Sequence, residues 1–345
     1  MTKSNPGRFL EDFTRGEVIS HATPRTITEG DVALNIALTG SRYALFCADS
    51  FAQGAGLPGA PIDPLLVFHI VFGKTVPDIS LNAVANLGYA EGRFLAPVYP
   101  GDTLHAVSEV LGVKQNSNGK TGVVTVRTTG FNQDEIPVLS YVRWVMVNKR
   151  GADPIEDAPP QTPAPVVAPP DLLLPQGLDF STYDAGLAGS PHLYEDYEIG
   201  EKIDHVDGVT VEEAEHQLAT RLYQNTAKVH FDAIAQQSSR FGKRLIYGGV
   251  TISLARALAF NGLGNAALML AINGGRHVNP LFAGDTLYAW SEVLDKTDLG
   301  EAGALRLRLV AAKNRACADF PDKSGGEYDP SIVLDFDYWA AIPKR

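Results

Sequence analysis

The sequence predicts an α+β fold in which an antiparallel sheet wraps around one buried helix, and it predicts this unit twice. Residues 92–111 match residues 275–294 at twelve of twenty positions, with a constant offset of 183. Each copy also has a strongly apolar segment, at 63–73 and 248–262, that suits a helix buried on all sides. Alternating apolar and polar segments near turn signals indicate strands in the rest of each copy. A repeat of this length indicates a duplicated domain, and helix with antiparallel sheet is the α+β class.

The elements come in the same order in both copies. A helix is expected first, at 26–40 and at 210–224, where Thr28 or Thr210 followed by acidic residues is typical of an N-cap. The apolar helix follows.

Strands and turns complete each copy. PGDTL and AGDTL predict hairpin turns at Gly101-Asp102 and Gly284-Asp285. Four further strands are expected, at 123–131, 138–147, 304–313 and 333–342.

A proline-rich linker joins the copies. Eight of the 22 prolines lie between Pro154 and Pro175, where helix is excluded and extended backbone is favoured. We therefore divide the chain into a first module at 1–150, a linker at 151–190 that crosses an outer surface, and a second module at 191–345.

Composition limits the function. The 345 residues carry a net charge of −11 with a pI of about 5.2, which argues against non-specific nucleic-acid binding. Cys47 and Cys317 form no CxxC pair, so neither a disulfide framework nor a zinc site is expected. The sequence shows no signal peptide and no apolar run of membrane-spanning length, so we expect a cytoplasmic protein that makes no membrane contact.

Three segments carry a resemblance to a known family. They are GRFLAPVYPGDTL with its repeat GRHVNPLFAGDTL, YQNTAKVHFDAIAQ at 223–236, and IYGGVTISLARA at 246–257. The chain resembles the double hot-dog members of the MaoC-like family of (R)-specific enoyl-CoA hydratases and dehydratases. The resemblance implies an acyl-CoA substrate, no cofactor, no metal, and a homodimer as the default assembly.

The two copies differ where that family places its chemistry. At an offset of 184, His230 aligns with Phe46, which carries no proton near neutral pH. Gly248 and Gly249 can present N–H groups at a helix N-terminus to a developing oxyanion, whereas the aligned Pro64 has no N–H. We therefore expect the reacting groups in the second module, with the first module shaping the substrate pocket.

The family pattern pairs the histidine with an aspartate five residues earlier, where this chain has Asn225. A carboxylate there would repel a substrate that carries its own carboxylate, whereas an amide can orient water without that repulsion. Asp232 is a rival base, and a solvated carboxylate at a helix start is the alternative interpretation. We expect His69 to be a core residue with satisfied hydrogen bonds. His277 has no partner in the first copy and belongs to no motif.

A cluster of cations surrounds this segment. It suits the substrate carboxylate, the CoA phosphates or a solvated face, and consists of Lys228, Arg240, Lys243 and Arg244.

By resemblance, we expect a hydro-lyase that adds water reversibly to a branched, carboxylated enoyl-CoA, with mesaconyl-CoA and β-methylmalyl-CoA as the expected pair. Alternatives are a hydratase for itaconyl-CoA, C4-linked mesaconyl-CoA or crotonyl-CoA, a hot-dog thioesterase, and a non-catalytic acyl-CoA binding protein.

Overall fold

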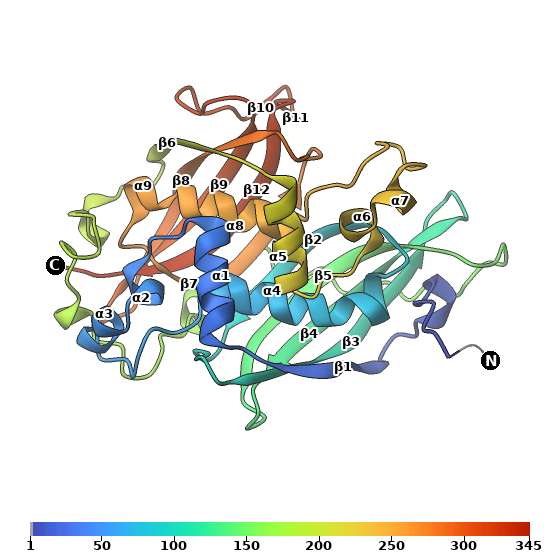
Figure 1. The fold of residues 1–345 in the computed structure, drawn as a ribbon, viewed down its shortest axis with the longest axis horizontal. Coiled ribbons are helices and arrows are strands. Elements are labelled where there is room, and N and C mark those ends of the chain that lie inside the picture. Colours follow the sequence, from blue (N-terminus) through green and yellow to red (C-terminus); the bar gives the residue numbers. More distant parts are fainter. Residues whose placement is uncertain (1–2) are drawn as a thin grey trace.

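One antiparallel sheet of ten strands forms the framework of the molecule. The computed structural model describes residues 3–345, and its strand order is β1-β3-β4-β5-β2-β7-β12-β9-β8-β6. The two five-stranded halves lie side by side, and the helices cover one face of the combined sheet (Figure 1). This arrangement is the double hot-dog fold that the sequence predicted.

The first module supplies half of the sheet and the first buried helix. Its elements are η1 (Leu10–Asp12), β1 (Val18–Thr26), α1 (Glu29–Thr39), α2 (Ala44–Cys47), α3 (Asp49–Gly54), α4 (Pro64–Thr75), η2 (Val76–Ser80), β2 (Ala83–Phe94), β3 (Thr103–Gln115), β4 (Thr121–Phe131) and β5 (Pro137–Asn148).

The second module repeats this order after the linker. Three short 3-10 helices come first: η3 (Pro169–Asp171) and η4 (Phe180–Thr182) lie in the linker, and η5 (Tyr194–Asp196) precedes the first strand of the module. The module itself contains β6 (Lys202–Thr210), α5 (Glu213–Leu222), α6 (Lys228–Phe231), α7 (Ala233–Gln236), α8 (Gly248–Leu258), α9 (Phe260–Leu263), β7 (Leu268–His277), β8 (Thr286–Asp298), β9 (Gly303–Lys313), β10 (Lys323–Ser324), β11 (Glu327–Tyr328) and β12 (Ile332–Ile342).

Strands β2 and β7 join the modules in an antiparallel seam. Tyr89 pairs with Gly275, and Gly92 pairs with Ile272. Each of these pairs becomes the other when the repeat offset of 183 is applied, so the seam lies on a pseudo-two-fold axis. The two modules are therefore related like the subunits of a symmetric dimer.

The helices α4 and α8 pack on the same face of this sheet and touch across the axis. All twelve residues of α4 are buried, which its apolar sequence predicts. The Nε2 atom of His69 on α4 lies 2.9 Å from the hydroxyl of Ser253 on α8. These two residues occupy aligned positions, because they differ by the repeat offset of 184.

Two local predictions were wrong. The helix α5 begins at Glu213 and its N-cap is Glu212, because Thr210 still belongs to strand β6 and bonds to the hydroxyl of Thr286. The PGDTL and AGDTL segments form turns, but not hairpins. The turn at Gly101 links β2 to β3, which are not neighbours in the sheet, because β2 pairs with β5 and β7. Only Thr28 caps its helix as predicted, with a capping box to Asp31.

The proline-rich segment follows the sheet from one module to the other. Ala158 pairs with Val113 on β3. The N–H of Val167 donates to the Oδ1 of Asn273 on β7 at 2.8 Å, and its carbonyl accepts from the indole of Trp339 on β12. Backbone polar groups of an extended segment thus obtain partners from both modules.

We predict that Gly73→Ala destabilises the protein by about 1–3 kcal/mol, because overpacking forces backbone shifts. A Cβ at Gly73 would lie 1.8 Å from the carbonyl oxygen of Tyr223, where α4 meets the segment that leads to His230. Urea unfolding measures the change. Gly54→Ala in α3 is the matched control, since its Cβ would meet nothing within 4 Å. Equal stability of the two variants would contradict this packing account.

Candidate active site

His230 is held in one orientation by the backbone of the second module. It lies on α6, and its Nδ1 is 3.0 Å from the carbonyl oxygen of Leu245. Because a carbonyl can only accept, Nδ1 carries the proton and donates it, which leaves the lone pair of Nε2 available. The ring also lies against Tyr247, with centroids 5.4 Å apart. This geometry prepares Nε2 to accept a proton.

Burial keeps this imidazole neutral. Desolvation lowers the pKa of His230 to about 4, and the hydrogen bond to Leu245 opposes the shift only in part. A neutral imidazole is the form that can accept a proton, so His230 is able to accept one throughout the neutral range.

The N-terminus of α8 presents two free N–H groups beside His230. The N–H of Tyr247, the N-cap residue, donates to the Nε2 of His216 at 3.0 Å. Gly248 and Gly249 follow in the first turn, where N–H groups have no partner within the helix. Unpaired N–H groups at a helix N-terminus, together with the helix dipole, are typical of sites that stabilise an oxyanion.

Neighbouring rings explain why both positions are glycine. A Cβ at Gly248 would lie 2.3 Å from the ring of His277, and a Cβ at Gly249 would lie 2.3 Å from the ring of Tyr247 and 2.7 Å from the ring of His69. Both imidazoles therefore pack directly against the proposed oxyanion site. His277 comes from the end of β7, and His69 comes from α4 of the first module.

Several buried polar atoms around this site have no partner within residues 3–345. They are Nε2 of His277, Nδ1 of His69, the phenol oxygen of Tyr247 and both amide atoms of Asn86. Buried polar groups normally have hydrogen bonds, so such a concentration is typical of a site that receives a polar ligand. The expectation that His69 is a satisfied core residue is wrong for Nδ1, although Nε2 does bond to Ser253.

Alignment of the two modules would have identified His277 as a candidate site residue. The motif is GRH in the second module and GRF in the first, so His277 aligns with Phe94 just as His230 aligns with Phe46. Asn86, on β2, aligns with Met269. A systematic search for polar residues aligned with apolar ones would have identified all three.

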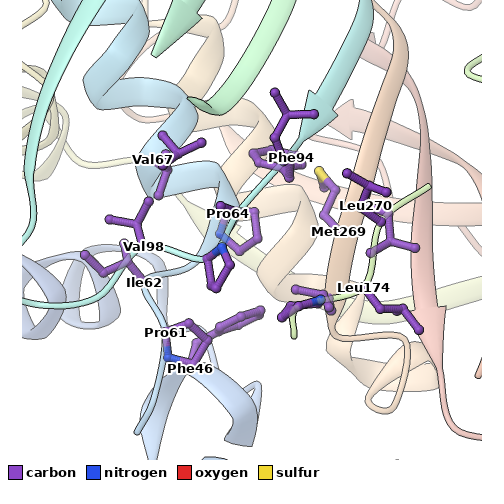
Figure 2. A pocket seen from close by; sticks show the side chains of 17 residues that line it. Phe46, Pro61, Ile62, Pro64, Val67, Phe94, Val98, Leu174, Met269 and Leu270 are labelled. Atoms are coloured by element: carbon purple, nitrogen blue, oxygen red, sulfur yellow. The ribbon is translucent and has the colours of Figure 1, made fainter. Parts of the chain in front are cut away.

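The first module has a cavity where the second has this polar site. Phe46, Pro64, Phe94 and Met269 contribute to the wall of this cavity (Figure 2). These are the aligned counterparts of His230, Gly248, His277 and Asn86. None of its lining side chains is titratable. The pseudo-two-fold axis thus relates a polar site to an apolar one.

The other two candidate residues each accept a hydrogen bond from a nearby backbone N–H group. Asn225 is buried, and its Oδ1 accepts the N–H of Ala227 at 3.2 Å. Asp232 is exposed, and its Oδ1 accepts the N–H of Ala235 at 3.0 Å, which caps α7. This geometry favours the helix-start interpretation of Asp232.

The four cations lie on or near the surface. Arg244 pairs with Glu213, Lys243 lies over the ring of Phe282, and Arg240 lies over Phe241. Lys228 is exposed. Lys228, Arg240 and Lys243 therefore lie outside the buried site around His230, whereas the largely buried Arg244 lies near His216. Within residues 3–345, no group of three His, Cys, Asp or Glu side chains is arranged to hold a metal ion, and no helix is long and apolar enough to cross a membrane.

Comparison with known proteins decides the family. The family model of mesaconyl-CoA hydratase matches residues 2–325. The chain belongs to the mesaconyl-CoA hydratase family. It is 60% identical to β-methylmalyl-CoA dehydratase of Chloroflexus aurantiacus, over 99% of each chain, and 60% identical to mesaconyl-CoA hydratase of Cereibacter sphaeroides, over 99% of this chain and 100% of that one.

Solved structures of this family and its neighbours share the fold. A MaoC domain protein from Chloroflexus aurantiacus, 59% identical and fully covered in both chains, superposes with a TM-score of 0.97. A Mycobacterium tuberculosis protein described as a double hot-dog superposes with a TM-score of 0.78 at 26% identity, over 97% of this chain and 98% of that one. Family membership makes the chain a hydro-lyase.

We predict that stability falls as the pH is lowered from about 6.5 to about 4. Burial lowers the pKa of five histidines to about 3 or 4, so in this range the unfolded state binds more protons than the folded state. They are His69, His205, His216, His230 and His277. Each contributes at most about 1.4 kcal/mol per pH unit. Burial raises the pKa of Asp63 to about 6, so this carboxyl binds more protons in the folded state than in the unfolded state. Its contribution to the slope therefore has the opposite sign and offsets that of about one histidine.

Urea unfolding between pH 7.5 and 4.5 measures this slope. His205→Gln should reduce the slope of the free energy of unfolding against pH by about the contribution of one histidine. A free energy of unfolding that does not change across the window would show that these imidazoles are not held neutral.

Proposed function

We propose that this chain catalyses the reversible addition of water to mesaconyl-CoA, which gives β-methylmalyl-CoA. The observation that carries the proposal is one neutral imidazole with a free Nε2 beside two free glycine N–H groups. This pair of features exists in the second module, and the first module has Phe46 and Pro64 instead. The named relatives, at 60% identity over nearly the full chain, support this substrate pair.

In the proposed mechanism, Nε2 of His230 takes a proton from water while the water oxygen bonds to the β-carbon. The electron pair of the double bond moves onto the thioester, and the enolate oxygen accepts hydrogen bonds from Gly248 and Gly249. The imidazolium then returns its proton to the α-carbon, so that one water is added in total. His277, whose ring touches Gly248, lines the site where the thioester oxygen would lie.

The remaining candidates have supporting roles in this proposal. Asn225 holds the turn before α6 and leaves the site without a carboxylate that would repel the substrate carboxylate. The surface positions of Lys228, Arg240 and Lys243 suit the phosphates of CoA. The homodimer, the cytoplasmic location and the absence of a cofactor stay predictions.

A spectrophotometric panel of CoA thioesters tests the proposal. We expect loss of the enoyl-thioester absorbance with mesaconyl-CoA, without release of free thiol. Release of thiol would indicate a thioesterase, and a preference for crotonyl-CoA over mesaconyl-CoA would contradict the substrate assignment.

We predict that His230→Phe lowers kcat for hydration by about 10²- to 10⁴-fold, because it removes the acid–base group. Phenylalanine is a sterically reasonable replacement, since Phe46 occupies the aligned position in the first module. The absorbance assay measures the loss, and a thermal unfolding curve checks that the variant is folded.

Asp232→Asn is the matched variant, because asparagine also caps helices well. We expect it to keep activity within about threefold, since capping and not proton transfer is the role its geometry supports. If Asp232→Asn lost as much activity as His230→Phe, the assignment of the base to His230 alone would be wrong.

A further inference from the structure

Arg143 is a fully buried cation without a counter-charge. It lies on β5 with 0% of its surface exposed. Its Nη2 donates to the hydroxyl of Thr75 at 2.8 Å, but Nε and Nη1 have no partner. No carboxylate within residues 3–345 pairs with it. An arginine stays charged in proteins, and a buried charge without a partner is costly.

The second module arranges the same pair of groups in reverse. In the first module the cation is on the strand and Phe72 is on the helix, with the guanidinium 4.2 Å from the ring centre. At the aligned positions, Arg256 is on the helix and Tyr338 is on the strand. Nη2 of Arg256 donates to the carbonyls of Ala266 and Ala267, although its Nη1 is also unpartnered. Backbone carbonyl oxygens thus accept hydrogen bonds from Arg256, whereas no backbone carbonyl within residues 3–345 accepts one from Arg143.

Arg143 belongs to the shell of rings around the candidate active site. It pairs with Tyr89 in the register of β2 and β5, and the ring of Tyr89 meets His277 edge-on at 6.1 Å. On its other side, Phe72 lies 5.8 Å from Tyr247, which in turn lies 5.4 Å from His230. Two routes of contacting rings therefore connect the guanidinium to the two imidazoles.

The groups near Arg143 can donate hydrogen bonds and therefore suit a bound carboxylate. The neutral phenols of Tyr89, Tyr141 and Tyr247 lie near Arg143, and the phenol oxygens of Tyr141 and Tyr247 are buried without a partner within residues 3–345. These are donors in an aromatic, water-poor surrounding, where a charge-assisted hydrogen bond is strong. Of the four cations predicted for this purpose, Lys228, Arg240 and Lys243 are exposed.

We propose that Arg143 binds the free carboxylate of the substrate and selects thioesters that carry one. The two oxygens of a carboxylate supply the acceptors that Nε and Nη1 lack. The inference rests on the proposed function and refines it, because it assigns the specificity for a short dicarboxylic monothioester to a residue of the first module. Arg143 is then a binding residue, and His230 keeps the proton transfer.

The test compares two substrates in Arg143→Met, which fills a similar space without charge. We expect kcat/KM for mesaconyl-CoA to fall at least about 100-fold, as for a truncated buried charge pair. Activity with crotonyl-CoA, which has no second carboxylate, should change less than about threefold. An equal loss on both substrates, or no loss on either, would overturn the proposal.

Arg256→Met is the matched control. It also removes a buried guanidinium that faces an aromatic ring, but in the second module. We expect it to lower the melting temperature without changing the ratio of the two kcat/KM values. A change in that ratio as large as for Arg143→Met would show that the effect is structural.

Binding to the wild-type protein gives a measurement that needs no folded variant. By calorimetry, methylsuccinyl-CoA, which cannot be hydrated, should bind at least about 30-fold tighter than butyryl-CoA. Equal affinities would overturn the role of Arg143. If the wild-type protein showed this preference but did not hydrate mesaconyl-CoA, the proposed function would fail and the carboxylate site would stand.

Discussion

The antiparallel pairing of β2 with β7 is the constraint on which the rest of the structure depends. It merges two sheets into one and makes Gly92 and Gly275 equivalent positions that a pseudo-two-fold axis relates. Side chains larger than hydrogen would collide there, since a Cβ at Gly92 would lie 2.8 Å from Ile272. Because the seam fixes how the modules face each other, it also sets the contact between His69 and Ser253.

This symmetry creates two equivalent sites in the fold, and their side chains make one polar and the other apolar. One is lined by imidazoles, an amide and glycine N–H groups, and the other by phenylalanine, proline and methionine. Burial is common to both. In the polar site burial keeps the histidines neutral and therefore able to accept a proton, whereas the wall of the apolar cavity has no titratable side chain.

The first module contributes more than a scaffold. Its α4 places His69 against Gly249, its β2 carries Asn86, and its β5 carries Arg143. A substrate bound at the N-terminus of α8 would thus meet groups from both modules.

The residues by themselves determined the duplication, the α+β class, the positions of both buried helices and the contrast between His230 and Phe46. These follow from local patterns, because apolar periodicity and aligned differences are visible along the chain. The hairpin expectation failed because strand order depends on distant pairing. Only the tertiary structure showed His69 and Arg143 near the site, since burial and missing hydrogen-bond partners arise when segments far apart in the sequence pack together.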